Sequence, residues 1–253
     1  MTEAIATLRG RFDPSRHGAL LALVVIVLFN LAVTPNFFQA QTLFVNISQV
    51  ATIAIVAMGM TLVIATGGID LSVGAIMALS GALAPLIFLS DFATANPGLG
   101  LAAAIVVPIL VALCCGVFNG VLVSVLNVQP IVATLIFVIS GRGLAQVLTN
   151  GNLQTFTHPS FSYLGTGKVL GLPFQGWLVL LIAVVLFWVV TRSVFGRQLL
   201  AVGGNERAAR LSGIPVHRVK IGAYVICGGL SGLAGLIVVA INSASDAARI
   251  GNL

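Results

Sequence analysis

The chain has 253 residues, of which 58% are hydrophobic and 7% are charged, and its mean hydropathy is +1.13. A soluble domain of this length cannot bury so much apolar surface, so the composition excludes a soluble globular protein and predicts several membrane-spanning helices. The net charge of +6 does not indicate nucleic-acid binding, because the basic residues lie mainly at the ends of apolar runs, where they orient a membrane protein.

Seven apolar segments reach, or nearly reach, the roughly 20 residues that a helix needs to cross a bilayer. They comprise residues 18–34, 47–66, 71–89, 99–126, 131–148, 176–190 and 221–241. We therefore expect an all-α fold, a polytopic bundle of transmembrane helices in which residues 1–253 form a single domain. Pro108 predicts a kink or a break in the fourth segment. Two Gly-x-x-x-Gly pairs, beginning at Gly116 and Gly228, have the spacing that lets helices approach closely.

Orientation follows from the positive charges that flank the apolar segments. Arg9, Arg11 and Arg16 precede the first segment, and no small-residue cleavage site follows it. We therefore expect an uncleaved first helix with a cytoplasmic N-terminus. Alternating crossings from there place residues 191–220 in the cytoplasm and residues 149–175 outside. The high positive charge of the former segment agrees with this topology.

The predicted cytoplasmic segment also carries the signals of a short helix. It holds six of the twelve Lys and Arg residues, namely Arg192, Arg197, Arg207, Arg210, Arg218 and Lys220. Asn205 suits a helix N-cap, and Glu206 favours the first turn and can pair with Arg210 four residues later. Gly213 can take the left-handed position that ends a helix, and Pro215 follows it closely.

These signals predict a helix of about two turns over residues 206–212. A helix this short is marginal in isolation, so it needs a surface on which to dock. A helix held on the cytoplasmic side is a feature that a partner protein could move. The alternative is a solvated basic loop that only orients the protein, which the capping signals and the alanine and leucine content disfavour.

A second polar sequence, Thr66-Gly67-Gly68-Ile69-Asp70-Leu71-Ser72-Val73-Gly74, separates the second and third apolar segments. Its two glycines permit a sharp turn or an unwound stretch, and Asp70 can then N-cap the following helix. The alternative is a break that lines a solute path. An ionisable residue at membrane depth is a functional candidate, and non-helical backbone there must face protein or a cavity.

Further polar side chains are scattered along the fourth and fifth apolar segments. They are Asn119, Asn127, Gln129, Thr134, Arg142 and Gln146. Neutral polar groups suit sugar hydroxyls, but they also suit hydrogen bonds between helices, which are the commoner use in membranes. The candidate residues for a translocation path are Asp70, Asn119, Thr134, Arg142 and Gln146.

No pattern in the sequence predicts an enzyme. The three histidines lie outside the apolar cores without a catalytic partner nearby, and the three cysteines give no metal-ligand spacing. A phosphate-loop pattern ending at Gly167-Lys168 fails, because Ser162 and Val169 replace two of its required residues. We therefore expect no catalytic residue, no metal and no cofactor. Any use of ATP must belong to a partner chain.

In combination and order, these motifs resemble the permease subunits of bacterial ABC sugar importers, in the ribose, xylose and galactofuranose branch of the branched-chain/sugar permease family. The stretches that carry the resemblance are residues 59–74, Phe118-Asn119-Gly120, residues 129–135, Gly141-Arg142-Gly143 and residues 196–213. Together they cover nearly the whole chain from about Asn46 onward. The resemblance implies the fold of a type II ABC importer permease, in the bacterial inner membrane.

What the resemblance further implies is an assembly. Two permeases, as a homodimer or a heterodimer, would combine with cytoplasmic ABC ATPase subunits and a periplasmic sugar-binding protein. The cytoplasmic loop 191–220 would place its helix in a groove of the ATPase, and the loop 149–175 would face the binding protein. The residues expected to couple to the ATPase are Gly204, Asn205, Glu206, Arg207, Ala208, Ala209, Arg210, Leu211 and Gly213.

Members of that family continue past the position of Leu253 through further spans, so we expect this chain to be a fragment or a truncated product. An ion-coupled secondary transporter, or a channel for a small neutral solute, is the alternative function. It would use Asp70 and Arg142, the ionisable residues that fall at membrane depth. An intramembrane enzyme is disfavoured, because the spans hold neither a Ser/His nor a paired-Asp arrangement.

Overall fold

The computed structural model describes residues 14–35, 37 and 39–251 of the chain. It comprises two units, Met1–Asn46 and Ile47–Leu253, and the boundary falls inside helix α3 (Ala40–Ala65). The first unit contains helix α2 (Pro14–Val33). Arg9 and Arg11, which support the prediction of a cytoplasmic N-terminus, lie outside the described residues, as does the side chain of Arg16.

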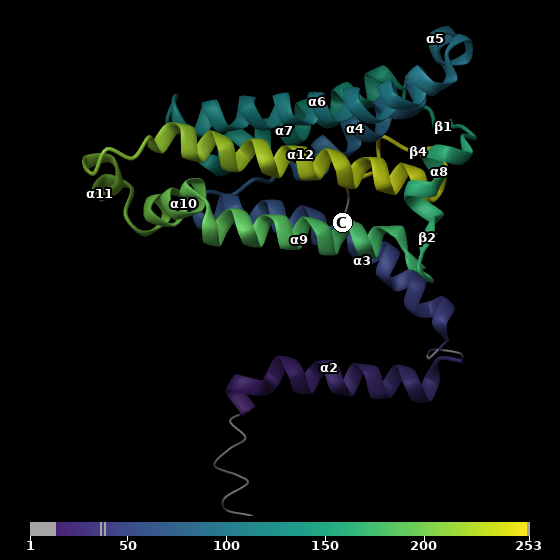
Figure 1. Cartoon of the computed structure of the whole chain (residues 1–253), viewed down its shortest axis with the longest axis horizontal. Coiled ribbons are helices and arrows are strands. Elements are labelled where there is room, and N and C mark those ends of the chain that lie inside the picture. The colour runs from purple at the N-terminus through teal and green to yellow at the C-terminus, as the bar shows by residue number, and fades with distance from the viewer. Residues whose placement is uncertain (1–13, 36, 38, 252–253) are drawn as a thin grey trace, which may run out of the picture. The chain divides into compact units, whose positions relative to one another are not determined.

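The second unit is helical almost throughout (Figure 1). After α3, its helices are α4 (Val73–Phe88), α5 (Asp91–Ala95), α6 (Pro97–Ser124), α7 (Pro130–Leu148), α8 (Pro159–Thr166), α9 (Phe174–Arg192), α10 (Val194–Gly204), α11 (Glu206–Leu211) and α12 (Val216–Asn242). Two short antiparallel pairs accompany them, β1 (Gln154–Thr155) with β4 (Ala244–Ser245) and β2 (Lys168–Val169) with β3 (Leu172–Pro173). The predicted all-α fold class is confirmed.

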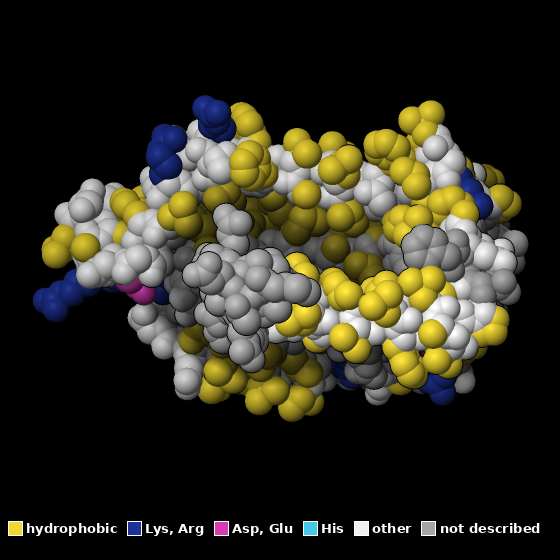
Figure 2. Space-filling view, turned by 90° about the horizontal axis from the view of Figure 1, so that it is seen from below, with side chains coloured by type: hydrophobic (Ala, Val, Ile, Leu, Met, Phe, Trp, Pro, Cys, Tyr) yellow, Lys and Arg dark blue, Asp and Glu magenta, His cyan; other side chains and the backbone are white. Residues whose placement is uncertain are grey.

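Each of the seven predicted apolar segments forms a helix. Among the described residues, five helices are long and apolar enough to cross a membrane, namely α3, α6, α7, α9 and α12. The apolar parts of α2 and α4 are shorter, so the full count of seven spans stays a prediction. Helix α6 continues through Pro108 and is therefore not broken there. Hydrophobic side chains dominate the coloured surface in Figure 2, while acidic side chains occupy a small area.

Helix α12 is the most buried of the five long helices, and it packs mainly against α6 and α4. The two Gly-x-x-x-Gly pairs make the close approach to α6 possible. A Cβ atom on Gly116 would lie 2.5 Å from the carbonyl oxygen of Tyr224, and one on Gly228 would lie 2.6 Å from that of Ala112. Both pairs therefore mark a contact between helix backbones, as their spacing predicted.

A buried apolar cluster joins α10, α11 and the start of α12 to the end of α3. We call it the α10–α12 core, and it contains Leu62, Val63, Val123, Ala133, Leu199, Val202, Ala209, Val216, Val219, Ala223, Tyr224 and Cys227. Within the second unit, α10 and α11 lie at one end of the long helices, and α5, α8, β1 and β4 lie at the opposite end (Figure 1). The predicted cytoplasmic and outer loops therefore occupy opposite ends of the bundle.

Candidate functional site

The chain between α3 and α4 leaves the helical path in a tight turn. Gly67 has a φ angle of 77°, a conformation that glycine adopts without strain. Its N–H donates to the carbonyl of Ile64 at 2.9 Å, and the N–H of Gly68 donates to that of Val63 at 3.1 Å. These bonds form a Schellman motif, which ends α3 and satisfies its last carbonyl groups. The predicted sharp turn at the glycine pair is thus confirmed.

Asp70 follows this turn and is fully buried. Its Oδ1 atom accepts hydrogen bonds from the N–H and the hydroxyl of Ser72, at 2.9 and 2.5 Å. Ser72, and not Asp70, is the N-cap residue of α4. The prediction that Asp70 caps this helix is therefore wrong, because an Asx turn ties its carboxylate to the residue two positions on.

A polar chain connects this turn to helix α6. The side-chain amide of Asn119 donates to the Ser72 hydroxyl at 2.7 Å, and that hydroxyl in turn donates to Asp70. Asp70 Oδ2 and Asn119 Oδ1 are buried, and no donor in the described part of the chain makes a well-formed hydrogen bond to either, although the weakly donating thiol of Cys227 lies near the Asp70 carboxylate. Buried acceptors are normally satisfied, so two spare acceptors in one place call for an explanation.

A cavity of about 520 Å³ lies beside Asp70. Its walls come from α3, the following turn, α4, α7 and the chain near Gly251, and they include Ile53, Met60, Asp70, Met77, Val138 and Arg142. The Arg142 guanidinium donates to the carbonyl of Ala248 at 3.0 Å. The cavity thus combines apolar walls with one carboxylate and one guanidinium.

The structure brings together some of the predicted path residues and separates others. Asp70 and Arg142 line the same cavity, and Asn119 reaches Asp70 through Ser72. Thr134 is buried but donates to a carbonyl of its own helix, that of Pro130, at 2.8 Å. Gln146 is exposed and does not line this cavity. Sequence reasoning missed Ser72, although the Gly-Gly-Ile-Asp-Leu-Ser motif contains it.

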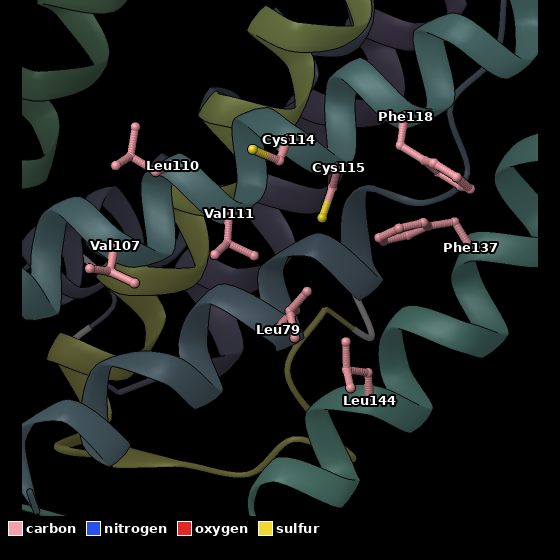
Figure 3. A pocket seen from close by; sticks show the side chains of 9 residues that line it. All are labelled: Leu79, Val107, Leu110, Val111, Cys114, Cys115, Phe118, Phe137 and Leu144. Atoms are coloured by element: carbon pink, nitrogen blue, oxygen red, sulfur yellow. The ribbon is translucent and has the colours of Figure 1, made fainter.

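A second pocket, of about 410 Å³, lies between α4, α6 and α7 (Figure 3). Its lining consists of Leu79, Val107, Leu110, Val111, Cys114, Cys115, Phe118, Phe137 and Leu144. The rings of Phe118 and Phe137 lie 6.1 Å apart across it. These side chains offer no strong hydrogen-bonding group, so the pocket does not suit a hydroxyl-rich solute.

The short helix predicted near residue 206 is present as α11. The Asn205 side chain accepts a hydrogen bond from the N–H of Ala208 at 2.9 Å, and Gly213 has a φ angle of 80°. Arg210 forms an ion pair with Glu206 at 3.1 Å. The predicted cap, ion pair and glycine stop are therefore all confirmed. The helix ends at Leu211, with Ser212 as its C-cap.

Helix α10 precedes α11 and was not predicted. The Ser193 hydroxyl caps it by accepting from the N–H of Gly196 at 3.0 Å. Its buried side chains, Leu199 and Val202, belong to the α10–α12 core. The N-cap serine and the spacing of these two apolar residues are the signals that would have identified this helix.

Glu206 has a second partner that the sequence did not reveal. Lys220, near the start of α12, places its ammonium 2.6 Å from Glu206 Oε2. The hydrogen bond from Lys220 is the main cause that lowers the pKa of Glu206, and Arg210 adds to it. Because the pKa of Glu206 is lower in the folded state, the ion pair stabilises the fold at pH values above the ordinary glutamate pKa of about 4.3. That contribution is lost as the pH falls through the lower folded value.

The outward face of α11 is basic and apolar. Arg207, Arg210 and Leu211 are exposed, and 84% of Leu211 is accessible to solvent. Ala209, on the opposite side of this helix, is buried in the α10–α12 core. Helix α11 therefore presents one exposed leucine beside exposed arginines on the side that faces away from the α10–α12 core.

The long apolar helices are those of a multi-pass membrane protein, and they enclose a cavity that contains a carboxylate and a guanidinium. The chain belongs to the family described as branched-chain amino acid transport system / permease component, whose model matches residues 42–251. No solved structure matches the chain.

Its relatives include three sugar permeases. The galactofuranose transporter permease protein YtfT of Escherichia coli is 37% identical, over 94% of this chain and 70% of the relative. The ribose import permease protein RbsC of the same organism is 39% identical, over 92% of this chain and 72% of the relative. The L-arabinose ABC transporter permease protein AraH of Azospirillum brasilense is 34% identical, over 92% of this chain and 66% of the relative. These relatives are transport permeases and not enzymes.

Proposed function

We propose that this chain is the membrane subunit of an ABC importer that moves a monosaccharide, a pentose or a galactofuranose-like sugar, across the bacterial inner membrane. The observation that carries this proposal is the identity of 37% to 39% with ribose and galactofuranose permeases over more than nine tenths of the chain. The absence of a phosphate loop from the sequence is consistent with ATP hydrolysis by a partner chain.

The cavity beside Asp70 is the proposed place where the sugar passes. Its volume of about 520 Å³ falls within the range of about 300–1,000 Å³ that is usual for small-molecule sites. Asp70 and Arg142 supply a carboxylate acceptor and guanidinium donors for hydroxyl groups. The buried oxygens Asp70 Oδ2 and Asn119 Oδ1 could accept further hydrogen bonds from the sugar hydroxyl groups, once the turn moves and exposes these atoms.

Helix α11 is the proposed contact with a cytoplasmic ABC ATPase. Its exposed arginines and Leu211 would meet a groove on that partner, while the buried Ala209 side holds it to the permease. The contact would be formed by Gly204 to Ala208, Arg210, Leu211 and Gly213, whereas Ala209, which the sequence also suggested, is buried against the permease. At the opposite end of the bundle, the segment 149–175 would meet a periplasmic sugar-binding protein (Figure 1). A second permease subunit, identical or different, would complete the channel, and the N-terminus would lie in the cytoplasm.

Reconstitution tests this function. The chain, its ATPase and its sugar-binding protein would be placed in liposomes, and uptake of radiolabelled ribose, galactofuranose, arabinose and fructose would be measured with and without ATP. We expect ATP-dependent uptake of at least one of these sugars. Uptake of none of them, with all three proteins present and folded, would refute the proposal.

The proposed path predicts which positions water can reach. Val138 and Ile139 are neighbours in α7, but Val138 lines the cavity, whereas Ile139 is 73% exposed on an apolar face. In a background without the native cysteines, we expect Val138→Cys to react with a charged, water-soluble thiol reagent at least about tenfold faster than Ile139→Cys, since thiolates form readily only in water. The transported sugar should slow the first reaction. Equal rates at the two positions would mean that the cavity is not a solute path.

A further inference from the structure

We propose that Lys220 and Tyr224 are positioning residues, which fasten helix α11 to the turn at residues 66–72 so that movement of this helix is delivered to Asp70. The inference rests on the proposed function, in which a partner ATPase moves α11. It adds the route by which that movement reaches the cavity.

The first connection joins α11 to α12. Glu206 stands in the first turn of α11, and its Oε2 atom accepts from the Lys220 ammonium at 2.6 Å. The Lys220 side chain is 16% exposed and that of Glu206 is 41% exposed, so the ion pair is shielded from water on the lysine side only. Because Arg210 holds the other oxygen of the same carboxylate at 3.1 Å, the orientation of Glu206 is fixed from two sides.

The second connection joins α12 to the turn. Tyr224 lies one helical turn after Lys220, on the same face of α12. Its side chain is fully buried, and its hydroxyl donates to the carbonyl of Ile69 at 3.2 Å. A Cβ atom on Gly68 would lie 2.9 Å from that hydroxyl, so the backbone of the turn rests against the tip of the ring. Ile69 immediately precedes Asp70.

Apolar packing makes the two connections parts of one body. The α10–α12 core contains Ala209 of α11, Leu199 of α10, Val219 of α12 and Val63 of α3. A Cβ atom on Gly203 of α10 would overlap the carbonyl oxygen of Ala65, so this helix also touches the end of α3 directly. Close-packed interiors transmit displacement instead of absorbing it. A push on α11 therefore reaches the turn through α12 and α10 together.

The experiment compares sugar transported per ATP hydrolysed in the reconstituted complex. Tyr224→Phe removes the hydroxyl and keeps the ring, and Lys220→Gln removes the charge while Lys220→Arg keeps it. We expect the ratio to fall about threefold for Tyr224→Phe and about tenfold for Lys220→Gln. Lys220→Arg should keep most of the wild-type ratio, because it keeps the positive charge. ATPase subunits should still co-purify with every variant, since none of these residues lies on the exposed face of α11.

Ser80→Ala is the matched control. The Ser80 hydroxyl lies 2.8 Å from the carbonyl oxygen of Ile76 in its own helix and 3.2 Å from that of Gly232 in α12, a contact across helices outside the α10–α12 core. For Ser80→Ala, the amount of sugar transported per ATP hydrolysed should stay at the wild-type value. An unchanged ratio in Tyr224→Phe and Lys220→Gln, or an equal loss in Ser80→Ala, would overturn the inference while leaving the proposed function intact. A wild-type complex without ATP-driven uptake would instead refute the proposed function, and the inference with it.

Discussion

The Glu206→Lys variant is expected to lose ATP-driven uptake by at least about tenfold, although the protein still inserts into the membrane. The new ammonium would lie beside Lys220 and Arg210, which now hold the Glu206 carboxylate at 2.6 and 3.1 Å. Three positive charges at one place would drive α11 away from α12 and misplace the surface offered to the ATPase. Uptake into proteoliposomes, normalised to the amount of inserted permease, measures the effect.

Asp91→Lys provides the matched control for this charge change. Asp91 begins α5, at the end of the bundle opposite to α11 (Figure 1). The Asp91→Lys substitution changes the charge by two units, as Glu206→Lys does. We expect its uptake to stay close to that of the wild type. If Glu206→Lys transports as well as Asp91→Lys, then α11 does not couple the permease to an ATPase.

The Gly116→Ala variant is expected to lower the free energy of unfolding by about 1–3 kcal/mol. The added methyl group would lie 2.5 Å from the carbonyl oxygen of Tyr224 and 2.8 Å from the Cα atom of Val225. Both neighbours are backbone atoms of α12, so neither can move aside without shifting the whole helix. The loss is measured as a lower midpoint temperature of unfolding in detergent, with size-exclusion chromatography used to quantify the folded protein that remains at each temperature.

Gly143→Ala separates this clash from the general effect of replacing a glycine in a helix. Gly143 lies within α7, and a Cβ atom there would meet no atom within 4 Å. We expect this variant to be as stable as the wild type or more so, by up to about 1 kcal/mol, because alanine favours helix. Equal loss of stability in both variants would mean that α6 and α12 do not touch through their backbones.

The parts of the site that the sequence predicted are those fixed by local chemistry. The cap at Asn205, the ion pair between Glu206 and Arg210, and the left-handed Gly213 all involve residues within eight positions of one another. Such contacts depend on helix geometry alone, so their spacing is enough to predict them. The turn at Gly67 is of the same kind.

The contacts that the sequence did not predict join distant elements or depend on which way a helix faces. Lys220 meets Glu206 across the loop between α11 and α12, and no spacing rule covers that distance. Thr134 and Gln146 were path candidates, yet they do not line the cavity that contains Arg142 from the same helix. The polar residues of this helix, Thr134, Ser140, Arg142 and Gln146, do not fall on one face, so the sequence does not indicate which face meets a cavity.

The most direct test of the account is the energy source for transport. Sugar uptake into liposomes that contain the permease, its ATPase and its binding protein would be measured under two conditions. One supplies ATP with the proton gradient collapsed, and the other imposes a proton gradient without ATP. We predict full uptake in the first condition and none in the second. Uptake that follows the proton gradient and ignores ATP would contradict the account and would favour an ion-coupled transporter that uses Asp70 and Arg142.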